Sequence, residues 1–143
     1  MSDFNTLIAK LEAATEGDRG LDGDIALAVG WRLISSIEPR LCTHTWFAPG
    51  EERGRDYLRI ETGSKWEEKI ADCVPWYTTS IDAALTLVPD GWAGTVDIPG
   101  KDNGCWLDPP NDRDDEIGRG RVYAIGSTSP LALCIAALTA RAA

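Results

Sequence analysis

The chain has 143 residues, a length that fits one compact domain. About 43% of the residues are hydrophobic and 26% are charged, which excludes a disordered polymer of low hydrophobicity. Acidic residues number 23 and basic residues 14, so the net charge is −9. This balance argues against proteins that bind nucleic acid or anionic membranes through a basic surface, and it favours a protein partner that is itself basic.

The sequence contains no stretch that approaches the roughly 18 consecutive apolar residues of a transmembrane helix. Its first residues interrupt their apolar pattern with Asp3, Lys10 and Glu12, which is not the pattern of a secretory signal. We therefore expect an intracellular protein without membrane contact.

The N-terminal part of the chain predicts two amphipathic helices. From Asp3 to Ala14, apolar residues recur at three- and four-residue spacing, which is typical of a helix with one buried face. A second helix is expected from Leu21 to Trp31, with Arg32 to Ile37 as a candidate continuation before Pro39.

The middle of the chain predicts a β-hairpin. Leu41 to Phe47 is rich in residues that favour strands, and Tyr57 to Thr62 alternates polar with apolar side chains. A polar turn from Pro49 to Gly54 separates the two strands, which are therefore expected to pair. The stretch from Lys65 to Val74 is either a short helix or an irregular loop, because Pro75 stops its helical spacing.

A third helix is expected near residue 80, because Thr79 and Asp82 have the spacing of a capping box. Its inward stripe is expected to consist of the apolar residues Ile81, Ala84, Leu85 and Val88.

The remainder of the chain predicts two strands, a loop and a helix. Trp92 to Ile98 and Arg119 to Ser127 are the expected strands. Gly100 to Gly118 is rich in proline, glycine and acids and is expected to be a loop. The last helix begins with Ser129 as its cap and Pro130 at its first position, and because it is apolar nearly all round it should be buried on more than one side.

Helices and strands do not alternate strictly in this order, which favours an antiparallel sheet covered by helices over a doubly wound parallel sheet. The expected fold class is therefore α+β, a small antiparallel sheet covered by helices in an α-β-α sandwich-like arrangement. The chain is expected to be a single domain over residues 1–143, with an irregular acidic loop at residues 100–118.

Cysteine and histidine do not form a catalytic or metal-binding pattern. His44, the only histidine, lies two residues from Cys42, but no nucleophile signature surrounds the pair. A zinc site that combined them with Cys73 and Cys105 would lack the paired short spacings of structural zinc sites. We therefore expect four free thiols, with Cys134 a small core residue, no metal, no cofactor and no enzymatic activity.

The acidic run from Asp112 to Glu116 looks like the start of a calcium loop but fails that pattern, because Ile117 and Tyr123 stand where glycine and glutamate are required. From Asp108 to Glu116 there are five acids and one arginine, with Trp106 just before them. Such a loop can dock on a basic surface, although a loop that only keeps the protein soluble is the alternative. The candidate partner-binding residues are Trp106, Asp108, Asp112, Asp114, Asp115 and Glu116.

The chain also contains six tryptophans, more than its tyrosines and phenylalanines together. We expect most of them to fill the core, since tryptophan buries a large area. The alternative is that one or two are exposed as anchors of an interface, where tryptophan is enriched.

Three parts of the sequence resemble a family of small phage and prophage proteins. They are Leu7 to Ala14 with Leu21 to Ala26, Tyr77 to Leu85 with Val88 to Trp92, and Ser129 to Leu138. Together they are similar to the phage ABA sandwich domain, whereas Arg32 to Val74 and Lys101 to Gly118 match nothing in it. The resemblance implies helices on a small sheet and a phage origin, and it brings no catalytic residues.

We therefore expect a phage-encoded, non-enzymatic protein-binding module that acts in the host cytoplasm on a host or phage protein with a basic surface. Its acidity suits competition for a nucleic-acid-binding surface, as in inhibitors of host defence such as anti-CRISPR proteins. The alternatives are a virion or assembly accessory protein, in which the acidity is incidental, and a small metal-dependent enzyme.

Overall fold

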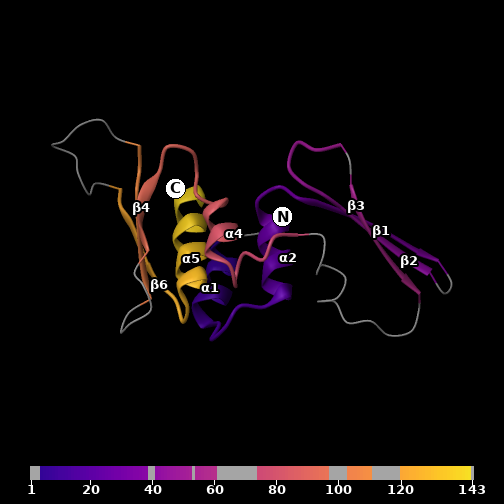
Figure 1. Cartoon of the computed structure of the whole chain (residues 1–143), viewed down its shortest axis with the longest axis horizontal. Helices are drawn as coiled ribbons and strands as arrows, with labels where there is room; N and C mark the ends of the chain where they lie inside the picture. The colour runs from indigo at the N-terminus through magenta and orange to yellow at the C-terminus, as the bar shows by residue number, and fades with distance from the viewer. Residues whose placement is uncertain are drawn as a thin grey trace. The chain divides into compact units, whose positions relative to one another are not determined.

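The structure is a computed structural model that describes residues 4–38, 41–52, 54–60, 74–96, 103–110 and 120–142. Within these ranges the chain forms helices and antiparallel strands, which confirms the expected α+β class (Figure 1). In chain order the elements are α1 (Phe4–Ala13), α2 (Arg19–Ala28), β1 (Arg32–Glu38), β2 (Leu41–Phe47), β3 (Arg55–Ile60), α4 (Ile81–Leu85), β4 (Ala93–Val96), β5 (Gly104–Asp108), β6 (Val122–Ile125) and α5 (Ser129–Ala142).

The chain divides by its internal contacts into two compact units. The first unit comprises Met1–Ser2 and Asp18–Pro75, and the second comprises Asp3–Gly17 and Trp76–Ala143. Each unit contains its own three-stranded antiparallel sheet, with the order β1-β2-β3 in the first and β4-β5-β6 in the second. The expectation of a single domain stays a prediction.

Helix α2 of the first unit begins at Arg19, ahead of the expected Leu21. The reason is Asp18, whose Oδ1 accepts a hydrogen bond from the backbone N–H of Leu21 at 2.7 Å and so caps the helix. Gly30, with φ at 106°, ends the helical conformation. The expected continuation of the helix over Arg32 to Ile37 is therefore wrong, and these residues form β1.

The sheet of the first unit confirms the expected hairpin. Strand β2 has the predicted bounds, and it pairs antiparallel with β1 on one side and with β3 on the other. Trp46 in β2 is fully buried, and Trp31, just before β1, is nearly so. Most of the stretch from Lys65 to Val74 lies outside the described residues, so neither interpretation of it is tested.

The buried side chain of Arg19 pairs with Asp22 in the first turn of α2 and also bonds to the end of the first unit. Arg19 Nη1 lies 2.7 Å from Asp22 Oδ2, and the Asp22 side chain is completely buried. The same guanidinium donates to the backbone carbonyls of Val74 at 2.8 Å and Pro75 at 3.2 Å. The Arg19 guanidinium thus holds the start of α2 and residues 74–75, which are distant in the sequence, next to each other. These bonds offset the hydration that the guanidinium loses on burial.

The second unit is built around α5. This helix packs against β5 and β6 on one side and against α1 and α4 on others, so it lies inside the unit (Figure 1). The expectation that it is buried on more than one side is confirmed. Its fully buried residues are Leu131, Ala132, Leu133, Cys134, Ala136, Ala137 and Leu138.

The cap of α5 lies one residue before the expected one. Thr128 Oγ1 accepts from the N–H of Leu131 at 3.4 Å, and its carbonyl accepts from the N–H of Ala132 at 3.0 Å, so Ser129 is already helical. Gly126 lets the end of β6 approach this turn, because a Cβ there would lie 2.6 Å from the Ala132 nitrogen. The short connection between β6 and α5 therefore requires glycine.

The expectation of an irregular loop over Gly100 to Gly118 is wrong for part of its length, because Gly104–Asp108 forms β5, the central strand of the second sheet. The described strands β4 and β6 fall inside the two predicted strand regions. At Gly94 in β4, a side chain would collide with the backbone carbonyl of Trp106 in β5.

Helix α4 presents a different face to the core from the one its sequence predicts. Ser80, not Thr79, caps it, since Ser80 Oγ accepts from the N–H of Ala83 at 3.2 Å. The expected inward residues Ile81 and Leu85 are 40% and 49% exposed. The helix ends at Leu85, and the turn that follows buries Leu87 instead, while Ala84 is buried as expected.

We predict that Leu133→Ala and Leu138→Ala each lower the free energy of unfolding by ~2–5 kcal/mol, because both side chains are fully buried. Leu85→Ala is the matched control, and at its half-exposed position the loss should be about 1 kcal/mol or less. Urea denaturation of the three variants measures the difference. Equal losses in all three would contradict the placement of α5.

A second prediction concerns the ion pair of α2. Arg19→Met should cost ~3–5 kcal/mol, because it leaves the buried Asp22 carboxylate without its guanidinium. The double variant Arg19→Met/Asp22→Leu should recover part of that loss, since no buried charge remains. A double-mutant cycle from urea denaturation gives the coupling energy, and a value near zero would contradict a buried pair.

Candidate functional site

The sheet of the second unit has one face buried against α5 and one face exposed. Side chains alternate along β5 and β6, so that Cys105, Leu107 and Ala124 are buried. The other face presents Trp106, Tyr123 and Ile125, which are 40%, 49% and 54% exposed. We call this the outer face and define it by Trp106, Asp108, Arg121, Tyr123 and Ile125.

An aromatic pair lies at the centre of the outer face. Trp106 and Tyr123 are opposite each other in the β5–β6 register, and their ring centroids are 5.6 Å apart at an interplanar angle of 35°. Contact between such rings stabilises their orientation by ~0.5–1.5 kcal/mol beyond area burial. The pair is therefore a preformed apolar surface. The sequence left open whether one or two tryptophans are exposed, and Trp106 is an exposed one.

An ion pair borders the aromatic pair on the same face. Arg121 Nε donates to Asp108 Oδ1 at 2.6 Å, and Arg121 Nη2 donates to Asp108 Oδ2 at 3.4 Å. This hydrogen bond and the carboxylate charge raise the pKa of Arg121 above its ordinary value. Asp108 was predicted as a partner-binding acid. Its negative charge is compensated by the guanidinium of Arg121.

The other predicted acids, Asp112, Asp114, Asp115 and Glu116, lie outside the described residues. Their place along the chain is nevertheless informative, because the segment that contains them connects β5 to β6. Its described flanks lie close together, since a Cβ on Gly120 would be 3.4 Å from Pro109 Cγ. The acids are thus attached to the sheet at the end where Asp108 and Arg121 pair.

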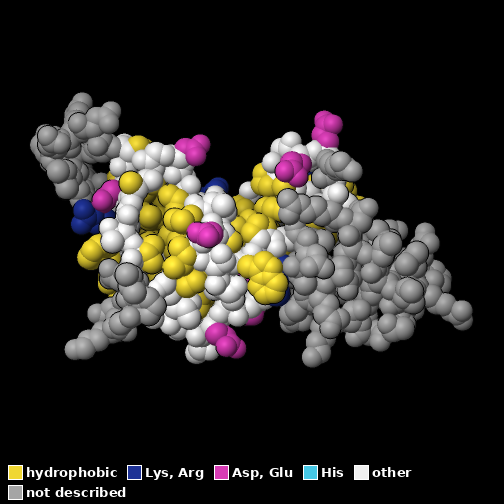
Figure 2. Space-filling model, in the orientation of Figure 1, with side chains coloured by type: hydrophobic (Ala, Val, Ile, Leu, Met, Phe, Trp, Pro, Cys, Tyr) yellow, Lys and Arg dark blue, Asp and Glu magenta, His cyan; other side chains and the backbone are white. Residues whose placement is uncertain are grey.

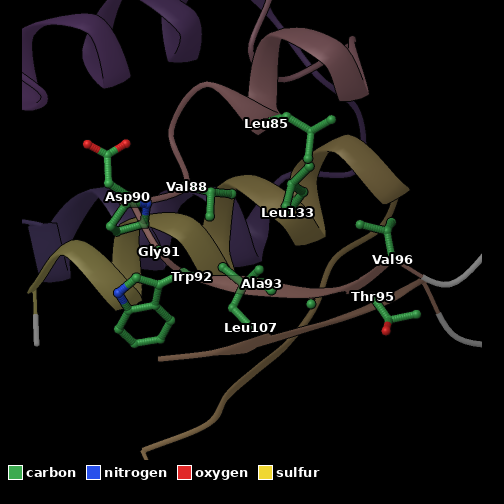
Figure 3. Close-up of a pocket in the computed structure, with 12 residues that line it drawn as sticks. Leu85, Val88, Asp90, Gly91, Trp92, Ala93, Thr95, Val96, Leu107 and Leu133 are labelled. Carbon is green, nitrogen blue, oxygen red and sulfur yellow. The ribbon is translucent and has the colours of Figure 1, made fainter. Parts of the chain in front are cut away.

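A hollow of about 380 Å³ is the second feature of this unit. Its lining comes from α4, α5, β4 and β5 together with the turn before β4 (Figure 3). In the space-filling view, hydrophobic side chains gather over this region (Figure 2). The sequence did not predict the hollow, because its helical spacing placed Ile81 and Leu85 on the buried side of the helix. The hollow also forms only where four elements, α4, α5, β4 and β5, meet.

The residues considered for catalysis or metal binding are described only in part, because Cys73 lies outside the described residues. Cys105 and Cys134 are buried thiols outside any disulfide, and Cys134 Sγ donates to the Tyr77 carbonyl at 3.1 Å, which confirms Cys134 as a core residue. Cys42 and His44 lie on β2 in the first unit. Within the described ranges, no group of three or more His, Cys, Asp or Glu side chains could hold a metal ion.

The helices among the described residues are all too short or too polar to cross a membrane. Comparison with protein families, with curated proteins and with solved structures finds no match for this chain. The resemblance to the phage ABA sandwich domain therefore stays a prediction, and the outer face and the hollow are the features from which a function can be inferred.

Proposed function

We propose that this protein is a non-enzymatic binding module that docks its outer face on a basic surface of a partner protein. The observation that supports this proposal is the exposed Trp106–Tyr123 pair on a sheet that packs against α5 with its other face. Tryptophan, tyrosine and arginine are the side chains that most often dominate the energy of an interface. The outer face combines all three, because Arg121 directly precedes β6 and lies two residues from Tyr123.

The geometry of the outer face suits burial against a partner. The two rings are already in contact, so less side-chain freedom is lost when a partner covers them. Ile125 extends the apolar area, and the Asp108–Arg121 pair supplies polar groups at its margin. An apolar centre with a polar margin is the usual anatomy of a specific protein interface.

The charge of the chain favours a basic partner. The net charge is −9, and four of the acids that contribute to it lie in the segment of the chain that connects β5 to β6. Such charges accelerate encounter with a basic surface and disfavour acidic partners. A surface that normally binds nucleic acid has the required charge, and a protein bound there would exclude the nucleic acid by competition.

The finer form of this proposal is a phage-encoded inhibitor of a host defence system directed at nucleic acid, similar in mode to anti-CRISPR proteins, acting in the host cytoplasm. It is supported by the acidity of the chain and by the resemblance of its ends and centre to a phage family. The two alternatives, a virion accessory protein and a metal-dependent enzyme, have no supporting observation among the described residues.

The test of the aromatic pair is capture of the partner from host lysate by wild-type and variant protein side by side. Trp106→Ala and Tyr123→Ala should each weaken capture about tenfold or more, because central aromatic residues contribute ~2 kcal/mol or more to binding. Ile34→Ala is the control, since Ile34 is at least as exposed as the two aromatic residues but belongs to the first unit. If the same proteins are captured in the same amounts by all variants, the outer face is not the interface.

The acids are tested by changing Asp112, Asp114 and Asp115 to Asn and Glu116 to Gln together. We expect an unchanged unfolding midpoint and a lower association rate with the captured partner, with the largest difference at low salt. Added salt should remove the difference, because charges are screened over roughly 8–10 Å near physiological ionic strength. An unchanged rate and an unchanged salt dependence would show that the acids only solubilise the chain.

A further inference from the structure

Trp106 has a different neighbour on each side of its strand. In the register of the second sheet it lies opposite Tyr123 of β6 on one side and opposite Thr95 of β4 on the other. Residues directly opposite each other in an antiparallel pair lie on the same face of a sheet. The Thr95 side chain accordingly points away from the hollow (Figure 3). Thr95 therefore lies beside Trp106, next to the outer face.

The Trp106 indole is covered unequally by these neighbours. On the β6 side it contacts the Tyr123 ring, with 5.6 Å between the ring centroids. On the β4 side the residues opposite Trp106 and Asp108 are Thr95 and Ala93, which are both small and exposed. Neither side chain is large enough to cover an indole. Trp106 is therefore accessible from the β4 side to a flat group of the partner.

A hydrogen-bond acceptor lies near this accessible side. Asp108 is two residues from Trp106 on the same face of β5, roughly 7 Å along the strand. Its Oδ1 accepts from Arg121 Nε at 2.6 Å, whereas within the described part of the chain its Oδ2 accepts only from Arg121 Nη2, at 3.4 Å. A bond of 3.4 Å is long, and a carboxylate oxygen has two lone pairs. The Oδ2 atom can therefore accept from a further donor.

These two features together select the side chain that fits them. A basic partner offers lysine and arginine, and both cations are attracted to the face of an indole. The ammonium of lysine is compact and strongly hydrated, whereas the guanidinium of arginine is planar and carries five N–H donors in its plane. Only the guanidinium can lie flat on the indole and donate sideways to a carboxylate at the same time. The charge of Arg121 is compensated by Asp108, so it repels such a cation little.

We infer that the outer face binds an arginine side chain of the partner, whose guanidinium stacks on Trp106 from the β4 side and donates to Asp108 Oδ2. This inference rests on the proposed function, because it names the partner group that meets the outer face. It adds a chemical preference that a merely basic partner does not require, namely arginine over lysine.

The probes are two blocked hexapeptides in which glycine alternates with either three arginines or three lysines. Each is added at physiological ionic strength to the full chain labelled with ¹⁵N, and binding is followed in nitrogen–proton correlation spectra. We expect the arginine peptide to shift the indole N–H of Trp106 and the amides of β5, and to bind at least threefold more tightly than the lysine peptide. The peptides have the same charge, so general attraction to an acidic chain contributes similarly to both.

Variants of the protein locate the preference. Trp106→Ala should abolish it, and so should Trp106→Leu, which keeps apolar bulk but removes the ring. Asp108→Asn should weaken the arginine peptide more than the lysine peptide, because the carboxylate acceptor is lost. Trp76→Ala is the matched control, since Trp76 is another exposed tryptophan of the second unit, and it should leave the preference unchanged.

Two results would overturn the assignment of arginine. One is equal affinity of the two peptides for the wild-type chain, and the other is a preference that persists in both Trp106 variants. The proposed function fails in a different experiment, since it requires Trp106→Ala to weaken capture of the partner protein. If capture weakens but the peptides bind equally well, only the assignment of arginine is wrong. If capture is unchanged, the outer face is not the interface, and arginine is not its ligand in the partner.

Discussion

The second unit depends on the burial of α5. A helix that is apolar nearly all round must be covered on every side, and here β5 and β6 cover one side while α1 and α4 cover others. Only one face of the sheet can cover α5, because successive side chains of a strand point to opposite faces. The outer face with Trp106 and Tyr123 is thus the necessary other side of the surface that buries α5. The hollow is also a consequence of how α5 is covered. Helix α4 has only five residues, and Leu133 of α5 lies in the lining of the hollow together with Leu85, the last residue of α4.

Under the proposed function, the outer face and the acids of residues 112–116 contribute to recognition over different distances. In this proposal, contacts of Trp106 and Tyr123 act only when a partner covers them, so they would govern how long the complex lasts. The proposed role of the acids between β5 and β6 in the sequence is to act over the longer distance that salt screening allows and so to influence the rate of encounter. The Asp108–Arg121 pair belongs to the outer face, and the charges of its two side chains compensate each other. This division explains why variants of the two groups should differ in their dependence on salt.

The first unit is stabilised by a different combination of forces. Its sheet is small, and burial of Trp46 and Trp31 supplies a large apolar area for so few strands. The guanidinium of Arg19 adds a directional constraint, because it bonds to Asp22 and to the carbonyls of Val74 and Pro75. An apolar contact tolerates small displacements, whereas this set of bonds holds the end of the unit at one position on α2.

The sequence alone determined the features that depend on local pattern. The nearly all-round apolar character of the last helix predicted that it is buried on more than one side, as it is. The sequence patterns of Leu41–Phe47 and of the region around Val122–Ile125 predicted the strands that the structure shows there. Only the tertiary structure decided what depends on a partner distant in the sequence. Arg32–Glu38 is a strand because β2 pairs with it after Gly30 ends α2, and Gly104–Asp108 is a strand because β4 and β6 flank it. The stripe of Ile81 and Leu85 showed that α4 has an apolar face, but periodicity cannot show whether a neighbour covers that face. The candidate sites were therefore only half visible in the sequence, because exposure is a property of how elements pack and not of their order.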